Sequence, residues 1–134
     1  MSLTIELKSH FLNLYHMAVA DSNADVRELE MLYRIGEAKG VTRTEIDTLL
    51  LQPNQAGISQ PQTVIEKIDC LYDLSLIAWA DGSVDPQERR ALELFCSRFG
   101  FKDENISQLC DFLLEEASKN TPKQQLLHTV SQNL

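Results

Sequence analysis

The sequence has few basic residues and no long apolar run, and these shortages exclude several classes of protein. Its 134 residues contain 12 Lys and Arg against 20 Asp and Glu, a formal net charge of −8. Because cationic side chains neutralise phosphates, this balance predicts no nucleic-acid partner and disfavours adsorption to an anionic bilayer. No apolar stretch approaches the roughly 20 residues that span a membrane, and the N-terminus lacks the basic-then-apolar pattern of a signal peptide. We therefore expect no direct membrane insertion and a cytoplasmic location.

Cysteine is also scarce. Cys70, Cys96 and Cys110 are the only three, and no two are spaced as CxxC, which excludes a zinc ribbon or a thioredoxin-type site. Each lies in an apolar run, where a free cysteine behaves as a small hydrophobic residue. We expect all three to be reduced and to serve in packing.

Common catalytic motifs are missing as well. The sequence has no GxSxG, no glycine-rich phosphate loop and no HExxH. His10 and His16 are six residues apart, so they do not share one helix face, and we interpret them and His128 as surface or partly buried residues. We expect a protein that is not an enzyme, with metal-assisted hydrolysis retained as an alternative.

Helical patterns run through the whole chain. Apolar residues recur at helical spacing, and no alternating run typical of a strand persists for more than a few residues. With 43% hydrophobic and 24% charged residues, the composition is that of a globular protein. The stretch from Leu71 to Ala80 is apolar on nearly every face except at Asp73 and Ser75, which predicts a buried helix. The sequence predicts one all-α domain over residues 1–134, with about seven helices.

An internal repeat organises this domain. When the sequence is shifted by 60 residues, residues 5–50 align with 65–110 without a gap, and 12 of 46 positions are identical. About three identities would be expected by chance from ordinary residue frequencies. We therefore predict two copies of a three-helix unit that share one core. The predicted segments are copy one at about 4–51, a linker at about 52–60, copy two at about 62–118 and a terminal helix at about 121–132.

Capping signals mark where the helices start and end. Thr42 with Glu45, Asp85 with Glu88 and Thr121 with Gln124 have the spacing of capping boxes, as have Asp25 and Glu28 in the first copy. Gly40 and Gly100 follow the second helix of each copy, where a left-handed C-cap is expected. The inward-facing residues of these two helices are predicted to be Leu29, Leu32, Tyr33 and Gly36 in copy one and Glu88, Leu92, Phe95 and Phe99 in copy two.

The turn between the first two helices carries the same acidic pattern, D-x3-D-x2-E, in both copies. Asp21, Asp25 and Glu28 form the first corner, and Asp81, Asp85 and Glu88 form the second. Clustered carboxylates suit hard divalent cations. The sequence does not fit an EF-hand, because its glycine and its final glutamate are both missing.

Two interpretations of these acids stay open. Asp25, Glu28, Asp85 and Glu88 have the spacing of helix caps, and Asp21 and Asp81 could accept hydrogen bonds from loop N–H groups. Asp21 and Asp81 also follow the end of a helix, where the dipole disfavours a carboxylate, and this placement suits cation binding equally well. The candidate cation ligands are Asp21, Asp25, Asp81 and Asp85, with Glu28 and Glu88 as capping or supporting groups.

The string from Ile77 to Phe101 resembles the signature of the TerB family of tellurite-resistance proteins, which is similar to the N-terminal domain of DjlA-type membrane co-chaperones. Ala80, Asp81, Gly82, Asp85 and Glu88 match that pattern, and the first copy has Ser22 in place of the glycine. The resemblance implies an all-helical fold of about seven helices with internal duplication. It also implies an acidic surface for divalent metal and a part in stress-response complexes, often near a membrane.

The function expected from the sequence is that of a non-enzymatic, TerB-like stress-response module. It would bind a divalent cation (Ca²⁺, Mg²⁺, Mn²⁺ or Zn²⁺) at its acidic corners and protein partners on its surface, and such partners could hold it at the membrane periphery. The alternative is a metal-independent interaction scaffold in which the acids only cap helices.

Overall fold

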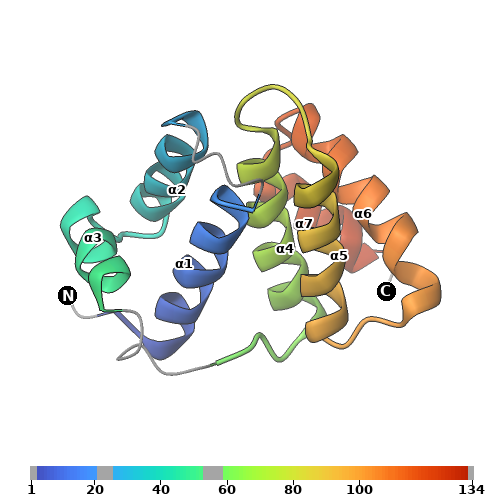
Figure 1. Ribbon diagram of the computed structural model, residues 1–134. Coiled ribbons are helices and arrows are strands. Elements are labelled where there is room, and N and C mark those ends of the chain that lie inside the picture. Colours follow the sequence, from blue (N-terminus) through green and yellow to red (C-terminus); the bar gives the residue numbers. More distant parts are fainter. Residues whose placement is uncertain (1–2, 21–25, 53–58, 133–134) are drawn as a thin grey trace.

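The computed structural model describes residues 3–20, 26–52 and 59–132 and is all-α, as predicted (Figure 1). The described part contains seven helices and no strand. They are α1 (Ile5–Ala18), α2 (Val26–Ala38), α3 (Arg43–Leu51), α4 (Val64–Trp79), α5 (Pro86–Arg98), α6 (Asp103–Ser118) and α7 (Lys123–Gln132). No helix among these residues is long and apolar enough to cross a membrane.

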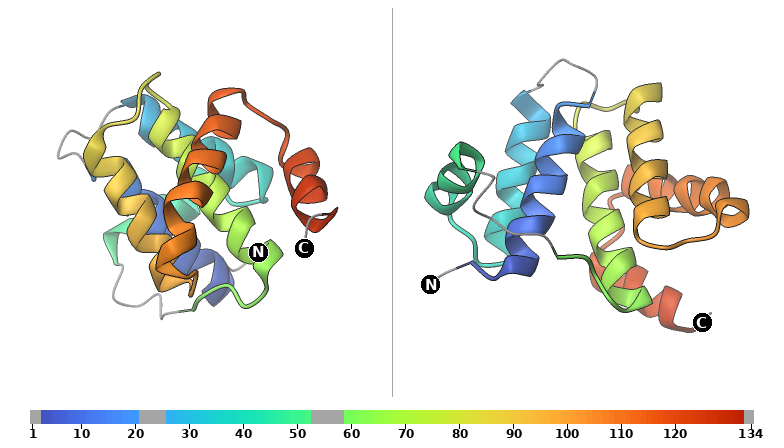
Figure 2. Two further views of the ribbon diagram at one scale, coloured as in Figure 1. Left: turned by 90° about the vertical axis from the view of Figure 1, so that its right-hand side faces the viewer. Right: turned by 60° about the horizontal axis from the view of Figure 1, so that its bottom comes forward.

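Helix α4 lies at the centre of the molecule. It packs against α1, α2, α5, α6 and α7 (Figures 1 and 2). Leu71, Leu74, Ile77 and Ala78 of α4 have no exposed surface. This burial confirms the buried helix predicted from a stretch that is apolar on nearly every face. It also places Asp73 and Ser75, the two polar residues of that stretch, inside the core.

The helix ends follow the capping signals of the sequence in most places. The capping boxes of Thr42 with Glu45 and of Asp85 with Glu88 are both formed. Gly40 and Gly100 have φ angles of +77° and +94°, which glycine adopts without the steric penalty of a Cβ atom. The C-caps predicted at these two glycines are therefore present.

The capping box predicted at the start of α7 is not formed. Helix α7 begins at Lys123, and no hydrogen bond joins Thr121 to Gln124, although both residues are described. The Thr121 N–H, which a capping box would pair with Gln124, instead donates to the Glu116 carbonyl at 3.2 Å.

The inward face of α2 is partly as predicted. Tyr33 is half-buried against the core, and its hydroxyl donates a hydrogen bond to Asp47 on α3. Ile35, which was not among the predicted inward-facing residues, is buried.

The helix boundaries agree with the 60-residue offset of the sequence. Helices α2 and α5 start and end 60 residues apart, and α3 and α6 start 60 residues apart. Helix α6 is longer than α3, and α7 has no counterpart in the first half. The common spacing is compatible with a duplication, which stays a prediction.

Candidate functional site

The second acidic corner lies at the turn between α4 and α5. Oδ1 of Asp81 accepts a hydrogen bond of 3.1 Å from the Ser83 N–H. Oδ1 of Asp85 accepts from the Gln87 N–H at 2.7 Å, and Oε1 of Glu88 accepts from the Asp85 N–H at 2.8 Å. All three carboxylates therefore bind backbone N–H groups of their own turn, which is the geometry expected for capping.

The first acidic corner is described only in part. Asp21 and Asp25 lie outside the described residues, and Glu28 is fully buried in the first turn of α2. Among the residues that are described, no group of three or more His, Cys, Asp or Glu side chains is placed to hold a metal ion. The cation sites predicted at Asp21, Asp25, Asp81 and Asp85 stay predictions.

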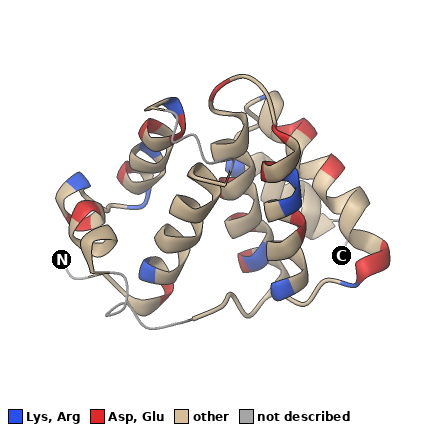
Figure 3. Ribbon diagram, in the orientation of Figure 1, with Lys and Arg blue, Asp and Glu red and all other residues tan. Residues whose placement is uncertain are grey.

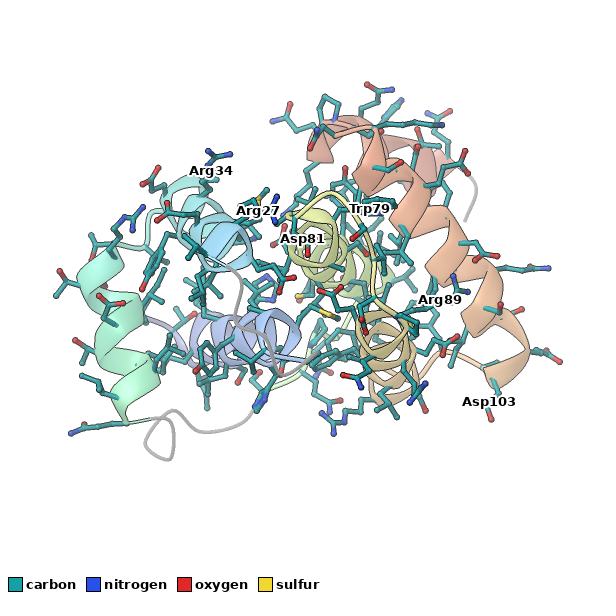
Figure 4. All side chains as sticks on the ribbon, turned by 45° about the horizontal axis from the view of Figure 1, so that its top comes forward. Arg27, Arg34, Trp79, Asp81, Arg89 and Asp103 are labelled. Atoms are coloured by element: carbon teal, nitrogen blue, oxygen red, sulfur yellow. The ribbon has the colours of Figure 1, made fainter. Side chains whose placement is uncertain are left out.

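A shallow groove of about 430 Å³ lies beside the second corner, and we call it the corner groove. It lies between α5, α6 and the end of α4; Figure 4 labels two of its lining residues, Trp79 and Arg89. Its lining consists of Trp79, Val84, Asp85, Pro86, Arg89, Asp111 and Leu114. Four of these seven side chains are apolar, so the groove offers an apolar surface together with charged groups.

Arg89 and Trp79 both line the corner groove. The Arg89 guanidinium is 2.7 Å from an Asp111 carboxylate oxygen and 3.2 Å from the Ser107 carbonyl, to which it donates a hydrogen bond. These contacts join α5 to α6. The indole N–H of Trp79 is buried, and it has no acceptor among the described residues. This N–H has no accessible surface, so the indole ring of Trp79 contributes apolar surface to the groove.

A second polar feature was not foreseen from the sequence: a cluster of charged residues around Asp73, which we call the central ion cluster. Its members are His10, Lys39, Asp69, Asp73 and Lys123. The Asp73 side chain is 1% exposed, its Oδ2 is 2.8 Å from His10 Nε2, and its Oδ1 accepts a hydrogen bond from the Lys123 ammonium. Lys39 lies 3.6 Å from the same carboxylate, and Lys123 is 2.7 Å from Asp69.

The electrostatics of this cluster keep Asp73 ionised. Burial alone would raise its pKa, but the hydrogen bond with His10 and the charges of Lys123 and Lys39 outweigh burial and hold the pKa below its ordinary value. The neighbouring Cys70 thiol is affected in the opposite sense, because burial and the charges of Asp69 and Asp73 raise its pKa to about 12. Cys70 is thus a neutral thiol near neutral pH and a poor nucleophile.

The central ion cluster joins distant parts of the chain. His10 comes from α1, Lys39 follows α2, Asp69 and Asp73 belong to α4, and Lys123 begins α7. His10 is 6% exposed, so its interpretation as a surface or partly buried residue is wrong. The one sequence signal for the cluster was the charge of Asp73 inside an apolar stretch, because a buried carboxylate requires a partner.

No protein-family model, no curated protein and no solved structure matches this chain. The resemblance to the TerB family rests on the residues from Ala80 to Glu88 and stays a prediction. The function is therefore inferred from the geometry of the chain itself.

Proposed function

We propose that the chain is a non-enzymatic protein-interaction module and that its contact surface is the corner groove. The observation that carries this proposal is the groove between α5 and α6, which Trp79, Val84, Pro86 and Leu114 line with apolar surface. A partner side chain that removes this apolar surface from water stabilises the complex by about 25 cal/mol for each Å² buried.

The charges at the groove specify the chemistry of the partner. Asp81, Asp85 and Asp111 lie at or near its rim, and Arg89 is already paired with Asp111. An excess of carboxylates favours a basic partner, because complementary potentials speed up encounter and fix register. We infer that the groove receives a peptide segment with a bulky apolar side chain next to a Lys or Arg. Tryptophan is among the residues that dominate binding energy at interfaces.

The divalent-cation function is a second candidate at the same corner. It is supported by Asp81, whose Oδ2 has no hydrogen-bond partner among the described residues, and which lies just beyond the C-terminal end of α4, where the helix dipole disfavours a carboxylate. A cation there would make partner binding metal-dependent. The two candidates are separated by measuring binding with and without metal.

A random-peptide phage library selected against the purified chain tests the proposal. Peptides with an apolar residue next to Lys or Arg should be enriched, and their affinity should fall at least about tenfold, or ~1.4 kcal/mol, in Trp79→Ala and Val84→Asn. Trp79→Ala removes the aromatic side chain that lines the groove, and Val84→Asn makes the lining polar without removing a large side chain. Leu94→Asn is the matched control, because Leu94 is 58% exposed on α5 and does not line the groove.

The same measurements distinguish the outcomes. Equal binding in EDTA and in millimolar Ca²⁺, Mg²⁺, Mn²⁺ or Zn²⁺ supports the metal-independent module. Binding that requires one of these ions and is lost in Asp81→Asn supports the cation function instead. Peptides that bind Val84→Asn as tightly as the parent chain would show that the corner groove is not the contact surface.

A further inference from the structure

Two buried cysteines meet where α5 packs on α6. Cys96 lies in the last turn of α5 and Cys110 in the middle of α6, and neither side chain has exposed surface. Their sulfur atoms are 3.9 Å apart. Since a disulfide has an S–S distance of about 2.05 Å, the two sulfurs are in contact and within a short movement of bonding distance.

The two sulfurs share one hydrogen bond, which either of them can donate. The hydrogen bond with Cys96 and the positive charge of Arg89 lower the pKa of Cys110, against the effect of burial. Because the thiolate is the reactive form of cysteine, the sulfur that accepts the shared hydrogen bond is the nucleophile, and the sulfur that donates it resolves the product.

Both sulfurs are fully buried where α5 packs on α6. A small oxidant therefore has to reach them during local opening of this helix contact. Arg89, which donates hydrogen bonds to Ser107 on α6, lies at the same contact between the two helices.

We propose that Cys96 and Cys110 form a reactive thiol pair that hydrogen peroxide converts into a disulfide. The thiolate of one cysteine attacks one peroxide oxygen, so that an S–O bond forms, the O–O bond breaks and hydroxide leaves. The sulfur of the other cysteine then attacks the sulfenic sulfur, the S–S bond forms, and the S–O bond breaks with loss of a second hydroxide. Both hydroxide ions leave as water with the two thiol protons, and the cysteines lose the two electrons that the peroxide gains.

The disulfide would tie together the two helices that form the walls of the corner groove. Its effect on partner binding rests on the proposed function, whereas disulfide formation does not. The chemistry of the pair is therefore measured directly, without a partner.

Cys70 is the built-in control for this reaction. It is less buried than Cys96 and Cys110, but its raised pKa keeps it a neutral thiol. If exposure alone determined reactivity, Cys70 would be oxidised first. If the contact between α5 and α6 determines reactivity, Cys96 and Cys110 are linked while Cys70 stays reduced.

The test treats the folded, reduced chain with hydrogen peroxide, blocks free thiols with an alkylating reagent and measures the mass and the linked peptides. We expect a monomer whose mass is that of the reduced chain minus two hydrogen atoms plus one blocking group, which is attached to Cys70. The linked peptides should join Cys96 to Cys110, and dithiothreitol should reverse this link. Cys70→Ser should behave like the parent chain, and Cys110→Ala should form no disulfide.

Three results would overturn the proposal. They are a disulfide that includes Cys70, a disulfide between two chains only, and a link between Cys96 and Cys110 that forms in urea but not in the folded protein. The comparison in urea keeps the test decisive even if Cys110→Ala is too unstable to purify.

Discussion

Asp73 shows how one charged residue is accommodated in the core of this protein. A carboxylate that is 1% exposed would be strongly unfavourable without partners. His10 and Lys123 contact its two oxygens, and Lys39 lies nearby. The Asp73 carboxylate on α4 therefore binds residues of α1 and α7, together with the residue that follows α2.

We expect the replacement of Asp73 to lower the stability of the protein. Asp73→Asn keeps the shape of the side chain but removes the buried charge bound by His10, Lys123 and Lys39 and leaves Asp69 as the remaining carboxylate beside the two lysines. We therefore expect unfolding to become easier by about 1–3 kcal/mol. Asp69→Asn is the matched control: Asp69 is 30% exposed, and its loss should be at most ~1 kcal/mol. Urea unfolding at neutral pH measures both, and equal losses would show that burial of Asp73 is not the cause.

The ionisation of Asp73 should also make the stability of the protein depend on pH in the acidic range. The pKa of Asp73 is lowered in the folded state, so its stabilising contribution is complete above the unfolded pKa of about 3.9 and is lost as the pH falls through the folded value. We expect the free energy of unfolding of the parent chain to fall below about pH 4. The fall should be shallower in Asp73→Asn, and parallel curves would contradict the assignment.

Helix α7 has the fewest buried residues of the described helices. Leu126 is its one buried residue, with Leu127 and Val130 partly buried beside it. Lys123 and the hydrogen bond from Tyr72 to Thr121 hold its beginning. Figure 2 shows α7 at the edge of the molecule, packed on α4. A helix of 10 residues is not stable alone in water, so this contact maintains it.

Leu126→Ala should therefore release α7 without unfolding the rest. The lost burial corresponds to about 2–5 kcal/mol, and we expect faster amide hydrogen exchange across Lys123–Gln132 with little change in α1 or α5. Leu127→Ala, on the same helix but only partly buried, should have a smaller effect. Exchange that rises equally in all helices would mean that α7 unfolds only together with the core.

At the scale of the whole molecule, charge is the dominant surface property. The net charge is −8 and the isoelectric point is about 4.8. Acidic positions are spread over most of the helices and are interspersed with basic ones (Figure 3). The molecule therefore repels copies of itself at neutral pH, and this repulsion vanishes where the net charge is zero.

This charge predicts a minimum of solubility near pH 4.8. Light scattering of the full chain should rise as the pH approaches that value from neutrality and fall again on further acidification. The minimum lies above the range in which Asp73 loses its charge, so the first rise should occur while the helical circular dichroism signal is unchanged. A rise that accompanies loss of that signal would indicate aggregation of unfolded chains instead.

The sequence by itself determined the helical class, the burial of α4 and most helix boundaries. These features depend on residues within one or two turns of each other: the box of Asp85 with Glu88 spans three residues, and the apolar character of α4 is continuous. The bonds of Asp85 and Glu88 could be predicted for the same reason. Asp21 and Asp25, the other half of the predicted site, lie outside the described residues.

Only the tertiary structure decided which distant residues meet. The two hydrogen-bond partners of Asp73 are distant in sequence: His10 lies 63 residues before it, and Lys123 lies 50 residues after it. The corner groove and the contact of Cys96 with Cys110 likewise require α5 to lie against α6. Local spacing carries no information on such pairs, because they depend on how helices pack around α4, and packing is set by the burial of all the apolar faces together.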